Sequence, residues 1–97
     1  MSAYFIADVK VHDLEAYRAS GYLEAARACA ADFGGNYVAR GGETVVFEGE
    51  WVPNRLVIIE FPDLASMRAW HSSVEYEPWK KIRQGLADSN IVGIDGV

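Results

Sequence analysis

The chain has 97 residues, 51% of them hydrophobic and 12% aromatic, which suits one domain with a single core (1–97) and argues against a disordered protein. Fourteen Asp and Glu against nine Lys and Arg give a net charge of −5, which argues against nucleic acid and anionic membranes as partners. Cys29 is the only cysteine and the first residues do not resemble a signal peptide, so we expect a cytoplasmic protein without an intrachain disulfide.

The first third of the chain predicts a strand and a long helix. Residues Ala3 to Val11 alternate in polarity, as in a strand with one buried face. Asp13 is a typical N-cap for the helix that follows, and Gly34-Gly35 supplies its end. Gly21 is the weak point of this helix, where either the helix bends or a neighbouring backbone comes close.

The middle of the chain predicts two more strands. Asn36 to Arg40 forms one, Gly41-Gly42 interrupts it, and Thr44 to Glu48 continues it as a bulged edge strand. Arg55 to Phe61 is an apolar run of strand formers with large side chains on both faces, which is typical of a central strand.

The last third predicts two helical pieces and a strand. Pro62 and Asp63 begin a helix, Pro78 opens a second piece over Trp79 to Leu86, and Ser89 to Asp95 is the last strand. The order βαββαβ indicates an α+β, ferredoxin-like fold with a four-stranded antiparallel sheet and helices on one face.

This arrangement leaves one face of the sheet uncovered. Right-handed crossovers place the first strand and Arg55 to Phe61 side by side in the middle, and we expect these two to run parallel. Four apolar side chains then lie on the bare face, which monomers seldom expose: Tyr4, Ile6, Leu56 and Ile58. We therefore predict a homodimer in which a second copy covers this face.

Several stretches of the sequence resemble the domain-of-unknown-function 1330 family over nearly the whole chain. The most specific are the Arg-Gly-Gly motif at Arg40 to Gly42 and the Ile-Glu-Phe-Pro motif at Ile59 to Pro62. The family is placed among the dimeric α/β-barrel proteins, which include cofactor-independent monooxygenases, haem-degrading enzymes and isomerases. The resemblance implies the fold and the dimer, and leaves the function open.

The chain departs from the haem-degrading branch of that superfamily. Asp8 and Trp70 match the first-strand and helical positions of its motif, but the later helix has Trp79, Lys80 and Lys81 where that branch has an iron-binding His. His71 points away from Trp70 on the same helix and is a poor replacement. We expect no cofactor and no metal site.

Two carboxylates are the candidate catalytic residues. Parity places Asp8 and Glu60 on the face that the partner should cover, and Arg40 on the second strand could reach both. In such a cluster a carboxylate could act as a general base in a partly dry cavity, and Arg40 would bind the anionic part of the substrate. The alternative is a structural ion-pair network that ties the dimer together.

A second group of side chains is the candidate substrate-binding set. Trp70, Tyr76 and Arg83, with Trp79 beside them, could wall a pocket for an aromatic or acidic ligand. The alternatives are core packing for Trp70 and a solvated helix face for Tyr76 and Arg83.

The sequence thus predicts a small homodimer that binds a small organic molecule, aromatic or acidic, between the sheet and the helices. It would act either as a cofactor-independent enzyme of monooxygenase or isomerase type, or as a non-enzymatic binding or accessory dimer whose charged cluster is structural.

Overall fold

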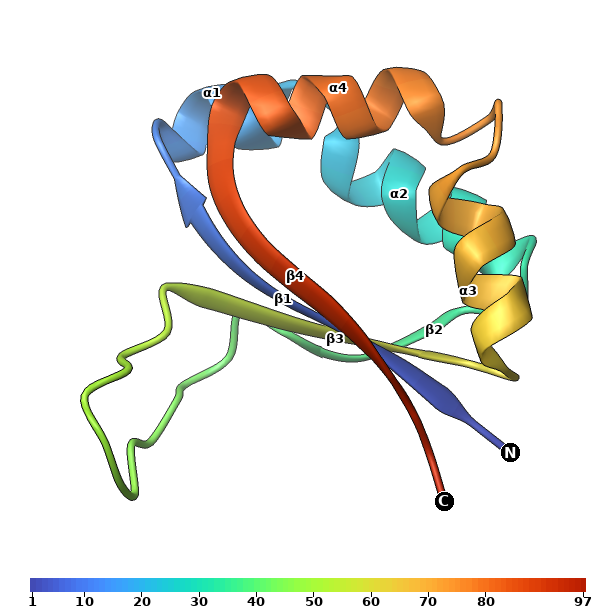
Figure 1. Cartoon of the computed structure of the whole chain (residues 1–97). Helices are drawn as coiled ribbons and strands as arrows, with labels where there is room; N and C mark the ends of the chain where they lie inside the picture. The colour runs from blue at the N-terminus through green and yellow to red at the C-terminus, as the bar shows by residue number, and fades with distance from the viewer.

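The computed structural model describes residues 1–97 as a four-stranded sheet with all helices on one side (Figure 1). In chain order the elements are β1 (Ala3–Val11), α1 (Leu14–Ala19), α2 (Tyr22–Ala31), β2 (Asn36–Arg40), β3 (Arg55–Phe61), α3 (Leu64–His71), α4 (Glu77–Leu86) and β4 (Ala87–Asp95). None of these helices is long and apolar enough to cross a membrane.

The sheet has the strand order β2-β3-β1-β4, and every neighbouring pair is antiparallel. The ferredoxin-like α+β fold is therefore confirmed. The expectation that β1 and β3 run parallel is wrong, although they are the two central strands. The helical crossover makes β1 and β2 parallel, and β3 lies between them and is antiparallel to both.

The long helix predicted before β2 is two helices that meet at Gly21. Asp13 caps α1 as expected, because its side chain accepts from the backbone N–H groups of Glu15 at 3.0 Å and Ala16 at 3.2 Å. Gly21 has φ of +80° at the start of α2, a left-handed conformation that suits glycine. The chain therefore bends at Gly21, one of the two alternatives that the sequence left open.

Residues 41–54 form an extended arm that stands away from the body of the molecule (Figure 1). The predicted continuation of the second strand over Thr44 to Glu48 is wrong, because these residues form no strand. The ladder with β3 ends where the Gly41 N–H donates to the Leu56 carbonyl at 2.9 Å, and no strand lies beside the arm beyond that point. The arm exposes several large apolar side chains, and its Phe47 is 90% exposed.

The core lies between the sheet and the helices. Alternate residues of β1 and β3 face the helices and are buried, including Phe5, Ile59 and Phe61. Trp70 and Tyr76 are fully buried above them, with ring centroids 4.4 Å apart in a stacked arrangement. The opposite face of the sheet carries no helix, as the sequence predicts.

Candidate functional site

A narrow cavity lies in the core between the sheet, α2 and α4, and we call it the inner cavity. Its volume of about 30 Å³ is room for about one water molecule. Most of its lining is aliphatic or aromatic, but three arginines also line it: Arg40, Arg55 and Arg83. In a chain with a net charge of −5, this concentration of cations around one apolar cavity needs a physical reason.

Arg83 is the most buried of the three arginines, with only 5% of its surface exposed. Its Nη1 donates to the Ser89 hydroxyl at 3.3 Å, and no carboxylate oxygen lies within 4 Å of its guanidinium. Burial lowers the pKa of Arg83, but its interactions with Tyr22 and Tyr76 outweigh burial, so the pKa is raised above the ordinary value. Arg83 is therefore a buried cation without a counter-ion, an arrangement that is costly unless something neutralises it.

Hydrogen-bond donors around the inner cavity also lack acceptors. The buried side-chain nitrogens or oxygens without a hydrogen-bond partner are Arg55 Nε, Trp70 Nε1 and Arg83 Nε, and all three residues line this cavity. The Cys29 thiol lies close to the Trp70 indole, which leaves the two guanidinium groups as the stronger signal. Unpaired buried donors are rare in proteins, and the two guanidinium Nε groups beside one cavity indicate a missing acceptor.

Two tyrosines provide a polar wall beside Arg83. The hydroxyl groups of Tyr22 and Tyr76 share a hydrogen bond of 2.5 Å. Burial, followed by the proximity of Tyr76, raises the pKa of Tyr22 well above its ordinary value. The Tyr22 side chain is therefore neutral at physiological pH and supplies a hydroxyl group, not a negative charge, to Arg83.

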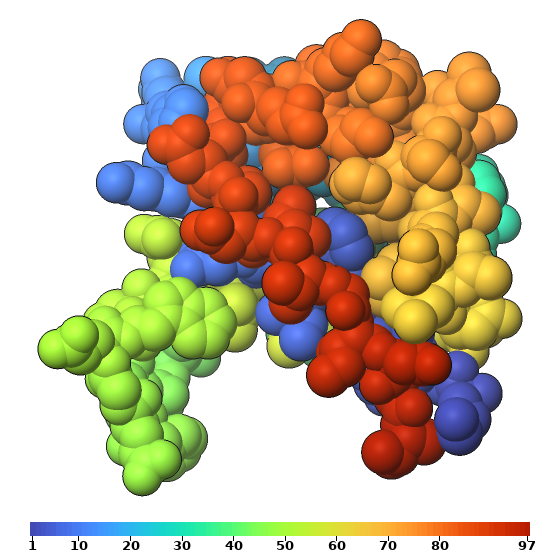
Figure 2. Space-filling view, in the orientation of Figure 1, coloured from blue at the N-terminus to red at the C-terminus, as the bar shows by residue number.

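Two open grooves follow one another along β4, one beside its first half and one beside its second half, and they share Ile91. The α3–β4 groove, about 550 Å³, runs between α3 and β4, and Figure 2 shows the hollow between these elements with β1 at its floor. The α4–β4 groove, about 460 Å³, includes Arg83 and Ser89. Ile91 lines all three spaces, and Phe5 lines the inner cavity and the α3–β4 groove.

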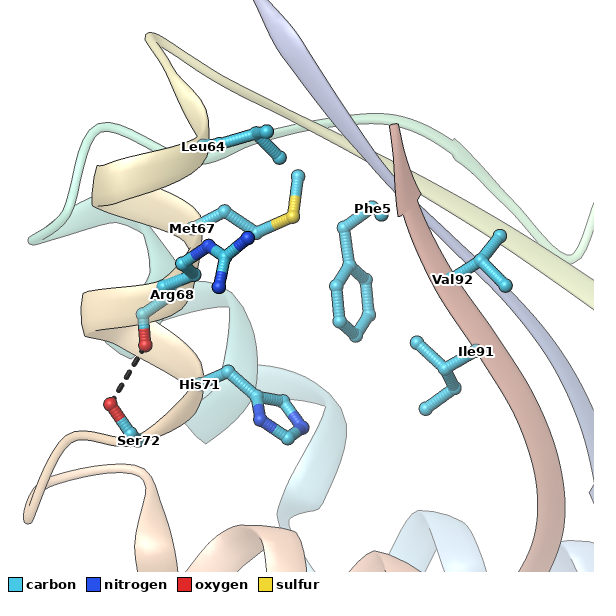
Figure 3. A pocket seen from close by; sticks show the side chains of 9 residues that line it. Phe5, Leu64, Met67, Arg68, His71, Ser72, Ile91 and Val92 are labelled. Atoms are coloured by element: carbon cyan, nitrogen blue, oxygen red, sulfur yellow. Dashed lines mark hydrogen bonds between the residues drawn. The ribbon is translucent and has the colours of Figure 1, made fainter. Parts of the chain in front are cut away.

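His71 lies where the two grooves meet, because it lines both of them. Figure 3 shows its imidazole pointing from α3 toward β4, beside Phe5, whose ring centroid is 6.1 Å away. Burial lowers the pKa of His71, and the positive charges of Lys80 and Arg83 lower it further. The imidazole is therefore neutral at pH 7, and no hydrogen bond within the protein occupies either ring nitrogen.

The predicted cluster of Asp8, Arg40 and Glu60 does not form. Asp8 and Glu60 share the bare face of the sheet as parity predicts, but Asp8 lies opposite Leu56, four residues from Glu60 or about 13 Å along β3. Arg40 pairs with Val57 on the helix-facing side. The cause is a bulge between Tyr37 and Ala39, which shifts the register of β2 by one residue and moves Arg40 to the other face.

Each predicted catalytic carboxylate instead has its own partner. Asp8 is buried and accepts from Trp51 Nε1 at 2.9 Å and from the Asn54 N–H at 2.8 Å, so it fixes the end of the arm to the sheet. Burial raises the pKa of Asp8, but these hydrogen bonds outweigh burial and lower it below the ordinary value. Glu60 accepts from the Tyr4 hydroxyl at 3.2 Å.

The predicted substrate-binding residues divide into a group that converges and one that does not. Trp70, Arg83 and Arg40 line the inner cavity, and the Arg40 guanidinium lies 5.6 Å from the ring of Tyr37. Tyr76 does not line the cavity but stacks on Trp70. The sequence analysis did not identify Arg55 as a site residue, and it considered His71 only as a poor iron ligand. The spacing on α3 could have indicated that His71 lies on the same side of the helix as the buried Met67, because one turn separates the two residues.

Comparison with solved structures finds the same fold in proteins that are described as antibiotic biosynthesis monooxygenases. A protein of unknown function from Rhodopseudomonas palustris is 19% identical with a TM-score of 0.76, over 99% of this chain and 82% of that one. SnoaB, a cofactor-independent oxygenase from Streptomyces nogalater, is 17% identical with a TM-score of 0.68, over 99% and 93%. A putative antibiotic biosynthesis monooxygenase from Nitrosomonas europaea is 13% identical with a TM-score of 0.62, over 100% and 99%.

The sequence establishes the family of this protein. Residues 2–97 match the domain of unknown function DUF1330, and the chain belongs to that family. The comparison with curated proteins finds no match.

Proposed function

We propose that this protein binds a small organic anion with an apolar body between its sheet and helices. The observation that carries the proposal is Arg83, a cation that is 5% exposed, has no carboxylate within 4 Å and lines the inner cavity. A carboxylate or enolate on the ligand would supply both the missing charge and acceptors for the unpaired donors.

The sizes of the inner cavity and of the α3–β4 groove indicate how such a ligand would lie. The inner cavity is too small for more than a polar end group, whereas the α3–β4 groove is within the range of small-molecule pockets. That groove is lined by Phe5, Leu64, Met67 and Ile91, which suit an aromatic or aliphatic body. The charged end would reach Arg83 past Ile91, which all three spaces share.

Chemistry on the bound molecule is the preferred role, and passive binding is the alternative. Neighbours of the same fold that are named as cofactor-independent oxygenases or monooxygenases support a small-molecule enzyme. Asp8 and Glu60 remain candidates for acid-base residues only if a ligand also reaches the bare face, and their hydrogen bonds favour the structural role.

We also propose that the protein is cytoplasmic, because the lone buried Cys29 suits a reducing compartment.

The test uses ligand-induced thermal shifts with phenylacetate and phenylpyruvate as probes and neutral benzyl alcohol as the uncharged comparison. We expect the acids to raise the melting temperature and the alcohol to have little effect, because stabilisation follows the ratio of ligand concentration to Kd. Arg83→Gln should abolish the shift. Lys81→Gln removes the same charge from the exposed side of α4 and should preserve it. Equal shifts with acids and alcohol, or an intact shift in Arg83→Gln, would contradict the proposal.

We also propose that a second copy of this chain covers the bare face of the sheet. Val92 and Ile94 lie beside Ile6 and Tyr4 on that face, and Ile58 lies on the other side of Ile6, so the apolar patch is continuous across three strands. The four strands average about 25 Å in length, and their spacing gives a width of about 19 Å, so the face covers about 475 Å². That area is more than half of the roughly 800 Å² that each partner buries in a standard interface. The exposed apolar side chains of the arm would add to it.

Sedimentation velocity would test this assembly. Ile58→Lys places a charge in the middle of the patch and should convert a dimer to a monomer. Val74→Lys, at a position 85% exposed on the helical side, should leave the dimer intact. A wild-type protein that sediments as a monomer at micromolar concentration would refute the dimer.

A further inference from the structure

The meeting point of the two grooves combines an unused proton acceptor with an unpaired cation. His71 and Arg83 both line the α4–β4 groove, and the charge of Arg83 acts on the imidazole. His71 also lines the α3–β4 groove, where the apolar body of the proposed ligand would lie. A molecule in that position would have its charged end beside Arg83 and its adjacent carbon beside His71.

We propose that His71 is a catalytic general base that removes a proton from the carbon next to the carbonyl group of a small 2-oxo acid anchored by Arg83. This inference rests on the proposed function and names its substrate class. The class follows from the site, because a 2-oxo acid has a carboxylate for Arg83, an acidic C–H bond for His71 and room for an apolar substituent in the α3–β4 groove.

The step balances without an oxidant or a metal ion. The C–H bond breaks as an N–H bond forms on the free ring nitrogen of His71, and the electron pair moves to the carbonyl oxygen as an enolate. Arg83 stabilises the negative charge that develops there. The imidazolium then returns its proton either to the enolate oxygen, which gives the enol, or to carbon. The reaction is therefore a keto–enol tautomerisation, and in heavy water it exchanges the carbon-bound hydrogen for deuterium.

The surroundings of His71 favour the basic form of the imidazole. Lys80 donates from Nζ to the His71 carbonyl oxygen at 3.0 Å, and Arg83 is a second cation on α4. Glu77, also on α4, raises the pKa of His71, and its carboxylate is paired with Lys80 at 3.1 Å. Arg68 of α3 adds a further cation to the lining of the α3–β4 groove. From β1 the imidazole meets the uncharged ring of Phe5, and the ring of Tyr76 lies at a centroid distance of 6.1 Å. From β4, Asp88 also lines the α4–β4 groove, where its carboxylate is paired with His12 at 3.1 Å.

Hydrogen–deuterium exchange at the CH₂ group of phenylpyruvate, followed by proton NMR in heavy water, tests this role. Wild-type protein should accelerate exchange over the buffer rate, and His71→Gln should lower the catalysed rate by about 10²- to 10⁴-fold, the usual contribution of a general base. The Kd for phenylpyruvate should change by no more than about twofold. The wild-type rate should rise with pH below 6.5 to a plateau, and this rise should be absent in His71→Gln.

The second histidine provides the matched control. His12 is exposed and pairs with Asp88 at 3.1 Å, so His12→Gln should exchange at the wild-type rate. If phenylpyruvate binds but exchanges at the buffer rate, or if His71→Gln retains the catalysed rate, the role of His71 is wrong and the binding site stands. If the wild-type protein binds neither phenylpyruvate nor phenylacetate, the proposed function fails and this inference fails with it.

Discussion

The hydroxyl groups of Tyr22 on α2 and Tyr76 at the start of α4 lie 2.5 Å apart in the buried layer above the sheet. This contact joins α2 to the start of α4 through a buried hydrogen bond. It also holds two neutral oxygens near Arg83. The pair is therefore a structural link that also borders the proposed ligand site.

Tyr22→Phe should destabilise the protein by about 1–3 kcal/mol, because the Tyr76 hydroxyl then loses its buried partner. Urea unfolding would measure the change. In a double-mutant cycle with Tyr76→Phe, the double variant should lose less than the sum of the single losses, since one shared hydrogen bond is removed twice. Additive losses would show that the two hydroxyls act independently.

Alkaline pH should destabilise the fold through the same tyrosine. Burial raises the folded-state pKa of Tyr22 above its ordinary value of 10.0, so the neutral form is favoured in the native state. The resulting stabilisation is complete below pH 10 and is lost as pH rises from 10 toward the folded-state pKa. The melting temperature should fall above pH 10, and less steeply in Tyr22→Phe than in the wild type. An equal slope in both proteins would assign the alkaline transition to other groups.

Arg83→Met should leave the ligand-free protein as stable as the wild type or more stable. The methionine fills similar space without a buried charge, and replacement of buried charges by apolar residues is often neutral or stabilising. Thermal unfolding without ligand measures this, and the same variant should show no shift with phenylacetate. A large loss of stability would mean that Arg83 supports the fold, as it would if the Ser89 hydrogen bond were its main role.

Asp8→Asn should loosen the arm without unfolding the sheet. The amide keeps the size of the side chain but removes the charge that accepts hydrogen bonds from Trp51 and Asn54. We expect a loss of about 1–3 kcal/mol in unfolding free energy and a change in tryptophan fluorescence as Trp51 is released. Because the folded-state pKa of Asp8 is lowered, its contribution is present above pH 3.8 and disappears as pH falls through the folded-state value.

A matched acid makes this prediction specific. Asp95→Asn removes a charge at the exposed end of β4 and should change neither stability nor fluorescence. Wild-type fluorescence in Asp8→Asn would show that Trp51 is held by other contacts.

The strand and helix pattern of this protein follows closely from its sequence, because hydrophobic period and caps act locally. Asp13 and Asp63 cap α1 and α3 as the sequence predicts, and alternation along β1 correctly separates Phe5 from Asp8. The arm could not be predicted in this way. Its Thr44 to Glu48 segment has the composition of a strand, but a strand also needs a neighbour, and the sheet offers none there.

The candidate site depended on two features that local sequence does not report. One register shift in β2 moved Arg40 from the side of Glu60 to the side of the helices. The importance of Arg83 came from the lack of a carboxylate within 4 Å of its guanidinium, which can be recognised only after α4 is packed against β4. Residue types thus suggested an anion site, but only the tertiary structure shows which arginine is unpaired.

Gly35 should be intolerant of a side chain, since it lies between α2 and β3. A Cβ atom there would lie 2.7 Å from the Phe61 ring and 2.9 Å from the Ala30 carbonyl oxygen. Gly35→Ala should therefore destabilise the protein by about 1–3 kcal/mol through overpacking. Gly85→Ala is the control, because no atom lies within 4 Å of its Cβ position on α4. It should instead stabilise by up to about 1 kcal/mol through helix propensity. Equal effects of the two substitutions on urea unfolding would contradict the close packing at Gly35.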